Sequence, residues 1–289
     1  MKKHSLSLIK AEQTALVELV KVVPMTAPSN EALALHRPLM PLINKFSDFL
    51  KKVSSSFSMD IEPEATDVLA TRDPNIAKLQ QRLANVPYID IIDQRVPVTP
   101  GLDVTWLEYL DAYRHPVEFS INMYDNYLKP FEKFLATAIT SPEQMSAVGK
   151  IITIKQADVQ GMLKAIAEPV SGNQRTVIRK YGDCAQRNAD TIEAMNLTKA
   201  MGEGLSSSNM DLVNASVDNI GKMLDTLAVQ IKDSNLPYRF NPKSIKELSE
   251  VTYDVAEMVE LYAAVYTRFA SHKQAMDDTA KKLLSVLPR

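Results

Sequence analysis

The hydrophobic residues in the C-terminal half of the chain recur at a regular helical spacing. Between residues 213 and 231 they alternate in steps of four and three, which places them on one face of an α-helix. These positions are Val213, Val217, Ile220, Leu224, Leu227 and Ile231. Three serines at residues 206–208, followed by Asp211, are typical of a helix start. We therefore predict a long helix that begins near these serines and buries this face.

The final segment predicts the longest helix. Asn241 can cap its first turn, with Pro242 at the first helical position, and the pattern continues to about Val286. Its apolar face follows a heptad over roughly forty residues, which is some 60 Å of helix at about 1.5 Å per residue. The positions on this face are Leu248, Thr252, Val255, Val259, Tyr262, Tyr266, Phe269, Lys273, Met276, Ala280 and Leu283.

Two further segments after residue 141 also have helical spacing. The first carries Met145, Val148, Ile152, Val159, Met162 and Ile166. The second has an unusually polar stripe that consists of Val177, Tyr181, Cys184, Asn188, Thr191 and Met195. Together with the two longer helices, these segments predict an elongated antiparallel bundle with heptad-patterned helices and connections at residues 169–173, 206–208 and 235–241.

Proline divides the N-terminal half into shorter elements. We expect a helix over residues 5–23 and another over residues 42–53, with Pro38 and Pro41 breaking or kinking its beginning. These expectations follow from apolar residues at helical spacing, with Ser5 as a possible cap of the first helix and Pro24 after its end.

Two more helices are expected before residue 141. Asp73 and Pro74 open a short one that continues to Leu83, with the acid as cap and the proline at the first helical position. A longer one begins near Asp103 and carries many aromatic residues. We expect it to bend or divide at Pro116, because proline removes a helical hydrogen bond.

Residues 87–100 have a different character. The segment is rich in β-branched residues and contains three prolines, which exclude a continuous helix. We interpret it as an extended arm that lies in a groove of its own protein or pairs with another chain. An ordinary packed loop is the alternative. The residues that would make the interaction are Tyr88, Ile89, Ile91 and Ile92.

Composition favours helices as the main element. Only 8 of 289 residues are glycine, against a usual share of about 7%, which disfavours sandwiches, barrels and Rossmann units. All eight lie at or after Gly101, whereas 12 of the 16 prolines lie at or before Pro142. We therefore predict an all-α fold with shorter helices and the arm in residues 1–140 and a long-helix bundle in residues 141–289. The two regions could equally form one continuous domain.

Four glycines fall inside the predicted helices. Each is expected to lower helix stability by about 1 kcal/mol relative to alanine. Close packing of neighbouring helices or a bend would explain their presence. The four are Gly149, Gly161, Gly182 and Gly221.

Charge and cysteine content narrow the classes of function. A net charge of -2 provides no general attraction to nucleic acid, so nucleic-acid binding is not indicated. The single cysteine, Cys184, cannot form an internal disulfide, which favours a cytoplasmic protein. The basic residues 1–5 lead into an amphipathic helix rather than a signal peptide. No uninterrupted apolar stretch of about eighteen residues predicts a membrane span.

The nearest match to a metal or acid–base site is formed by Asp111, His115 and Glu118. Their spacing of four and three places them on one helical face, although Pro116 lies inside the triplet. No second pair of ligands accompanies them, so we predict no metal site, no catalytic residues and no cofactor. A helical-bundle enzyme with a carboxylate and histidine site at these positions is one alternative.

A binding module is the second alternative. It would present the polar stripe around Asn188 and Thr191, or the basic face around Arg179, to a nucleic acid or a partner helix. Basic residues on helices more often form a solvated face, and exposed aromatic residues are not interleaved with them.

A short segment also resembles a known class of proteins. Residues 37–46, with the sequence RPLMPLINKF and glycine-poor helices after them, are similar to virion structural proteins of large tailed bacteriophages. The resemblance implies a structural role in a virion. Considered with the long helical seams and the arm, it favours a non-enzymatic helical structural or assembly protein. We expect protein partners, as a homo-oligomer or as a subunit of a larger particle, in the cytoplasm or in a virion.

Overall fold

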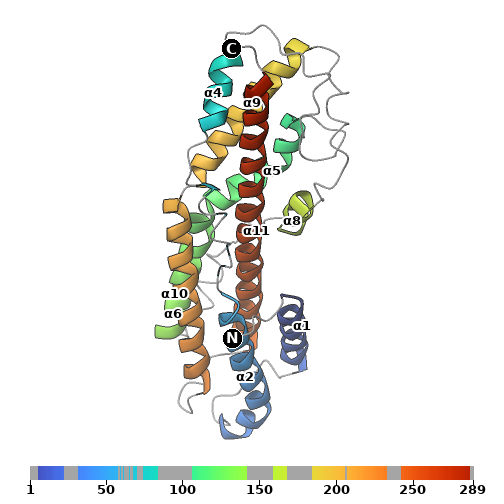
Figure 1. Ribbon diagram of the computed structural model, residues 1–289. Coiled ribbons are helices and arrows are strands. Elements are labelled where there is room, and N and C mark those ends of the chain that lie inside the picture. Colours follow the sequence, from blue (N-terminus) through green and yellow to red (C-terminus); the bar gives the residue numbers. More distant parts are fainter. Residues whose placement is uncertain are drawn as a thin grey trace. The chain divides into compact units, whose positions relative to one another are not determined.

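The described part of the chain is helical throughout its regular structure (Figure 1). The structure, a computed structural model, describes residues 6–22, 32–57, 59, 61, 65, 68–69, 74–83, 106–141, 159–167, 184–205, 207–232 and 242–286. Within these ranges no residue lies in a β-strand. The predicted all-α fold class is confirmed.

The helices end close to the expected positions in most cases. They are α1 (Leu6–Val22), α2 (Ala32–Ser54), α4 (Pro74–Leu83), α5 (Trp106–Ile121), η1 (Tyr124–Leu128), α6 (Lys129–Thr140), α8 (Val159–Ala167), α9 (Cys184–Gly204), α10 (Ser207–Lys232) and α11 (Pro242–Val286). Proline stands at the first position of both α4 and α11, as its missing N–H and fixed φ favour.

Internal prolines do not divide α2 or α5. The expected break at Pro38 and Pro41 is absent, because α2 continues from Ala32 to Ser54. Likewise, α5 continues through Pro116 for five more residues. Pro116 and Val117 are buried. Their packing compensates for the free energy lost with the helical hydrogen bond that proline cannot make. The prediction of a break or division at these three prolines is therefore wrong, whereas the alternative, a kink or bend, stays a prediction.

The helical path changes instead at η1, a single π-helical turn before α6. The backbone N–H of Lys129 bonds to the carbonyl of Tyr124, five residues earlier. Two buried residues, Met123 just before this turn and Leu128 at its end, are also five positions apart. In a regular α-helix that step would rotate Leu128 away from Met123, so the π turn keeps both side chains buried.

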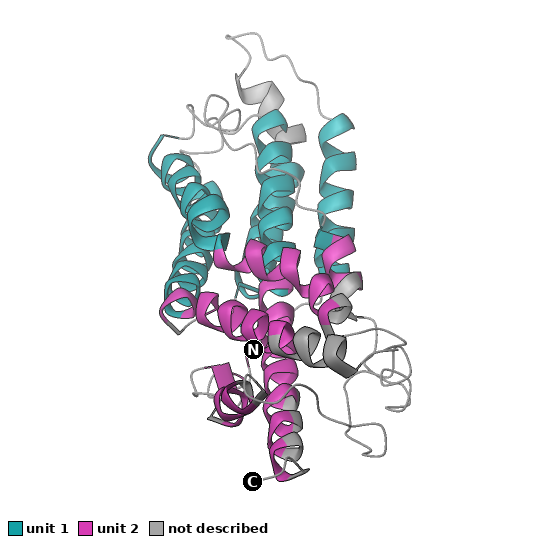
Figure 2. Cartoon of the chain, turned by 90° about the horizontal axis from the view of Figure 1, so that it is seen from above, with its two compact units in different colours: residues 1–59, 122–159, 211–260 teal, residues 60–121, 160–210, 261–289 magenta. Residues whose placement is uncertain are grey.

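The residues form two compact units, coloured teal and magenta in Figure 2. Unit 1 contains residues 1–59, 122–159 and 211–260, and unit 2 contains residues 60–121, 160–210 and 261–289. Each unit therefore combines segments from both sides of residue 141. The 45 residues of α11 are divided between the two units after Glu260.

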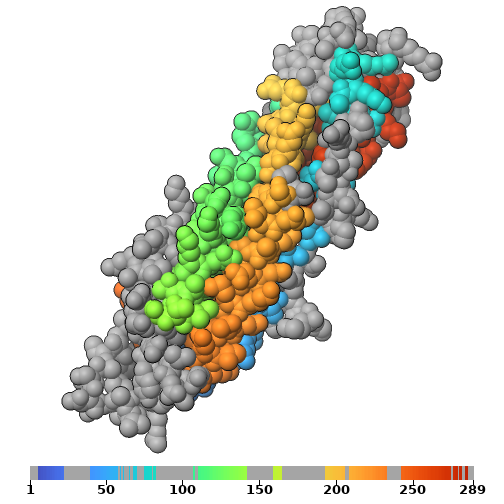
Figure 3. Space-filling model, turned by 90° about the vertical axis from the view of Figure 1, so that its left-hand side faces the viewer, coloured from blue at the N-terminus to red at the C-terminus, as the bar shows by residue number. Residues whose placement is uncertain are grey.

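The core of unit 1 is built around α10. All six residues of its predicted apolar face, from Val213 to Ile231, are fully buried. Polar groups also join α10 to its neighbours. Ser47 Oγ of α2 donates to the Ala228 carbonyl at 2.7 Å, and Ser216 Oγ donates to Glu132 Oε1 of α6 at 2.9 Å. Figure 3 shows the side chains of α6 and α10 next to one another.

Gly221 of α10 lies next to the end of α2 in unit 1. A Cβ atom at this position would lie 3.4 Å from the Ser54 carbonyl oxygen and 3.6 Å from the Phe57 Cβ. These are ordinary van der Waals distances, so an added Cβ would fit, and close packing does not explain Gly221. Gly149 and Gly182 lie outside the described residues. Ser54 also donates a hydrogen bond to Asp225 Oδ1 at 2.6 Å, which holds the same two helices together.

In unit 2, α9 packs against both α5 and α4. Ala194, Met195 and Thr198 of α9 are fully buried. The part of α11 in this unit buries a continuous face of large side chains, which are Leu261, Tyr262, Val265, Tyr266, Phe269 and Met276. This packing places two polar residues of α11, His272 and Lys273, inside the core of unit 2.

Candidate functional site

Lys273 is a buried cation in unit 2. Only 3% of its surface is exposed. Its ammonium donates hydrogen bonds to the backbone carbonyls of Val68 at 3.0 Å and Leu69 at 3.2 Å. Both residues are helical, and carbonyl oxygens favour a cation. These bonds compensate part of the free energy that burial of an ammonium requires.

Asp277 lies one turn further along α11, on the same face as Lys273. Its Oδ2 accepts a hydrogen bond from Asn75 Nδ2 at 2.7 Å, and its Oδ1 accepts one from the backbone N–H of Ile76 at 3.4 Å. Asn75 and Ile76 belong to the first turn of α4, where N–H groups have no partner within the helix. A carboxylate is favourable at this end of a helix.

His272 lies beside Lys273 in an aromatic environment. Its Nε2 is 3.1 Å from Thr198 Oγ1 of α9. Its ring centroid lies 6.0 Å from that of Tyr113 and 5.7 Å from that of Phe269. Burial lowers the pKa of His272 to about 3, so the imidazole is neutral at pH 7. This geometry suits a group that joins α5, α9 and α11 rather than one that exchanges protons near neutrality.

Unit 1 contains a second polar group, on α11 opposite α1. Tyr253 Oη donates to Glu257 Oε1 at 2.5 Å, and Lys10 Nζ lies 4.2 Å from the centre of the tyrosine ring. Burial raises the pKa of Tyr253, and Glu257 adds to that effect.

Asp254, next to this tyrosine, has a pKa raised to about 6. Burial is the main cause, and the charge of Glu257 adds to it. Lys10 opposes the shift, whereas Glu250 reinforces it. Asp254 therefore changes charge near neutral pH.

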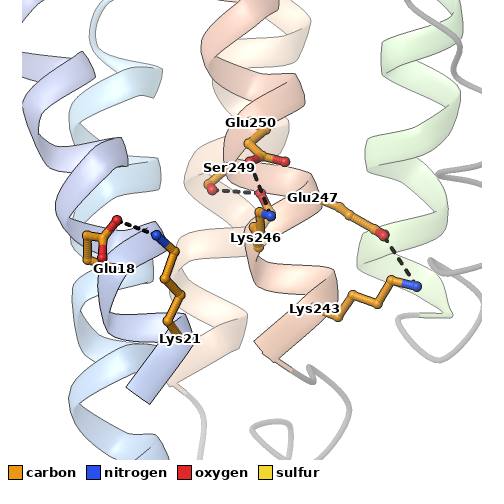
Figure 4. Close-up of polar contacts among 7 residues, drawn as sticks. All are labelled: Glu18, Lys21, Lys243, Lys246, Glu247, Ser249 and Glu250. Atoms are coloured by element: carbon orange, nitrogen blue, oxygen red, sulfur yellow. Dashed lines mark hydrogen bonds and ion pairs between the residues drawn. The ribbon is translucent and has the colours of Figure 1, made fainter. Parts of the chain in front are cut away.

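The ends of α1 and α11 carry exposed ion pairs within each helix (Figure 4). Glu18 and Lys21 of α1 are 2.6 Å apart. In α11, Lys243 pairs with Glu247 and Lys246 with Glu250, both at 3.8 Å. Charges at this spacing on an exposed helix contribute little free energy and form a solvated surface.

The predicted triplet Asp111, His115 and Glu118 lies on α5, and all three side chains are exposed. The helix is continuous through Pro116, so the spacing that groups them is retained. Asp111 Oδ1 forms an ion pair with Arg114 at 3.2 Å. Among the residues that the structure describes, no three His, Cys, Asp or Glu side chains are placed to hold a metal ion.

Several other predicted positions lie outside the described residues. They are the arm at residues 87–100 with Tyr88, Ile89, Ile91 and Ile92, the basic residue Arg179, and the side chains of Cys184, Asn188 and Thr191 on α9. The interaction predicted for the arm therefore stays a prediction. Most of the methionines in these helices are core residues: Met195, Met201, Met210, Met258 and Met276 are buried, whereas Met223 is half-buried.

The heptad of the last helix predicts Lys273 on its buried face, and this burial is confirmed. The same pattern predicts no structural role for His272 or Asp277. A signal was present for His272, since it follows Phe269 by three residues and so lies next to the buried face. The partners of Asp277 are about two hundred residues away in sequence, and local spacing contains no information about them.

Comparison with known proteins adds no relative. No protein-family model, curated protein or solved structure matches this chain. In the described segments, no helix has an apolar stretch long enough to cross a membrane.

Proposed function

We propose that this chain is a non-enzymatic helical structural protein that acts by self-association or as a subunit of a larger particle. The observation that carries the proposal is α11. It is one helix of 45 residues with a buried face from Leu248 to Ala280. At about 1.5 Å per residue it is about 68 Å long. A buried helix of this length suits a protein whose role is mechanical rather than chemical.

The use of polar groups in the core supports the same proposal. Ser47 bonds to a carbonyl of α10, Thr198 to the imidazole of His272, and Lys273 to the carbonyls of Val68 and Leu69. Each bond joins two segments that are far apart in sequence. Buried hydrogen bonds of this kind favour one arrangement of packed helices over alternatives.

Exposed apolar side chains provide surface for association with other chains. The large ones on α1 are Leu8 and Val22, and those on α10 are Leu212 and Val229. Val22 is 79% exposed and Val229 is 64% exposed. Burial of such residues at an interface would contribute about 25 cal/mol per Å². We propose that a second copy of the chain, or another subunit of the same particle, covers them.

The segment that resembles phage virion proteins lies in α2. Within residues 37–46, Leu42, Ile43 and Phe46 are buried in the core of unit 1. Their apolar character therefore has a structural reason. The resemblance extends the proposal to a biological setting, in which the larger particle is a virion.

Light scattering across a concentration series tests the proposal. We expect a defined oligomer, and we expect the double variant Leu212→Glu with Val229→Glu to reduce its mass. Thr140→Glu, at an exposed position of α6 outside this surface, is the control and should leave the mass unchanged. A monomer at every concentration would contradict self-association. An oligomer that both variants leave intact would exclude the α10 surface as its interface.

A further inference from the structure

The face of α11 that carries Lys273 and Asp277 holds another segment at two points. We call this segment the strap and define it by its described residues, which are Ala65, Val68, Leu69 and α4. Lys273 binds the strap at Val68 and Leu69, and Asp277 binds it at the first turn of α4. The two anchors are four residues apart, so they point from the same side of α11.

The two anchors match the electrostatics of the groups that they bind. A cation meets carbonyl oxygens at one point, and a carboxylate meets the N-terminus of α4 at the other. If the two charges were exchanged, a carboxylate would lie beside the carbonyl oxygens and an ammonium beside the N–H groups of α4, and both contacts would be repulsive. The contacts therefore specify one position of the strap on α11.

Four of the described side chains of the strap are both apolar and buried. They are Ala65, Leu69, Ile76 and Leu79. By contrast, α10 alone buries six residues of its apolar face completely. Segments with few buried apolar contacts open at a lower free energy than the core.

The length of α4 makes its structure dependent on docking. It has 10 residues, and isolated helices shorter than about 12–15 residues are marginal in water. Its contacts with α9 and Asp277 therefore stabilise the helix itself. Once the strap leaves α11, α4 loses both its N-terminal carboxylate and its packing.

From these contacts we propose that the strap docks and opens as one unit, and that Lys273 and Asp277 together control that equilibrium. The strap is thus a conformational device built into unit 2. Its opening exposes the surfaces of α9 and α11 that it covers, without unfolding α10 in unit 1.

Hydrogen exchange of the full chain, read by mass spectrometry, tests this proposal. Asp277→Asn should increase the exchange rate of the amides of α4 at least about tenfold, since a hydrogen bond to a charged group is lost. It should also increase exchange at Val68 and Leu69, where the other anchor binds. Lys273→Met should produce the same pattern, and amides of α10 should keep their rates in both variants.

Two neighbours on α11 serve as matched controls. Asp278 and Lys281 are exposed, so Asp278→Asn and Lys281→Met should leave the strap protected. Unchanged exchange of α4 in both anchor variants would overturn the proposal. So would an increase confined to the residues beside the altered anchor, because the strap would then not open as a unit. Equal loss of protection in α4 and α10 would also overturn it, because the strap would then not open independently of α10.

Discussion

Units 1 and 2 use the same long helix in different ways. In unit 1, α10 buries apolar side chains and one neutral polar residue, Ser216, and the half-buried acid Asp254 of α11 has its pKa raised by burial. In unit 2, α11 carries an imidazole and an ammonium into the core. The two units therefore differ in which protonation state their folded form favours.

The difference gives the units opposite responses to acid. The pKa of His272 is about 3 when folded, below its ordinary 6.5, so its contribution to stability is complete above pH 6.5 and is lost as the pH falls towards 3. The pKa of Asp254 is about 6, above its ordinary 3.8. Its contribution is complete below pH 3.8 and is lost as the pH rises through 6. Between pH 6 and pH 3.8, a fall in pH therefore lowers the stability of unit 2 and raises that of unit 1.

The largest effect is expected from the apolar core of unit 1. Leu224 is fully buried at the centre of the α10 face, so Leu224→Ala should lower the free energy of unfolding by about 2–5 kcal/mol. Protection of α10 amides against hydrogen exchange measures the change. Leu212→Ala on the exposed side of the same helix is the control. A near-zero effect at Leu224 would mean that this face is not the core of unit 1.

The next largest effect is the response of unit 2 to acid. Its free energy of unfolding should fall by about 2 kcal/mol between pH 6.5 and pH 5, because one proton is linked at about 1.4 kcal/mol per pH unit. The only tryptophan of the chain, Trp106, belongs to α5 in unit 2, so its fluorescence can follow denaturant unfolding at each pH.

Replacing His272 separates this response from other titrations. His272→Leu should remove most of the pH dependence in this range. His115→Gln, on the exposed face of α5, should leave it unchanged. If the wild type and His272→Leu lose stability equally on acidification, the imidazole is not the linked group.

Asp254 should give a smaller effect of opposite sign. Because its carboxyl is partly solvated, screening reduces the free energy involved. Asp254→Asn should increase protection of α10 at pH 7.5 and reduce the gain in protection that the wild type shows on acidification to pH 5. Asp218→Asn, an exposed position on α10, is the control. A loss of protection in Asp254→Asn at pH 7.5 would reverse the sign predicted for unit 1.

The smallest effect is expected from a surface ion pair of unit 1. Lys232 and Asp48 are 2.9 Å apart, with side chains that are 40% and 58% exposed. Lys232→Met should change stability by less than about 1 kcal/mol, and the change should diminish at high salt. Thermal unfolding at low and high salt measures it. A larger, salt-independent loss would show that an exposed lysine can matter as much as the buried Lys273.

The spacing of apolar residues was sufficient to predict the helices that are stabilised mainly by burial of one apolar face. The bounds of α1, α4, α10 and α11 follow from caps, prolines and apolar periodicity, and the buried face of α10 was predicted residue by residue. The all-α class followed from the same patterns and from the low glycine content.

Features that depend on packing between distant segments were not predicted. The continuity of α5 through Pro116 depends on burial that the sequence does not reveal. The contacts of Lys273 with Val68 and of Asp277 with Asn75 join residues about two hundred positions apart. The polar partners of α11 are therefore known only from the structure, whereas its apolar face was predicted from the sequence.

The π-helical turn at η1 makes its segment tolerant of a change in length by one residue. Asn126 is exposed there, so its replacement by another polar residue should be well tolerated. Its deletion would reduce the step from Met123 to Leu128 to four residues, which a regular α-helix keeps on one face. Phe131 and Phe134, now buried, would then stay directed to the core. In sequences that share this segment, we therefore expect both variation in residue type at Asn126 and gaps of a single residue, with an α-helical turn in place of the π turn.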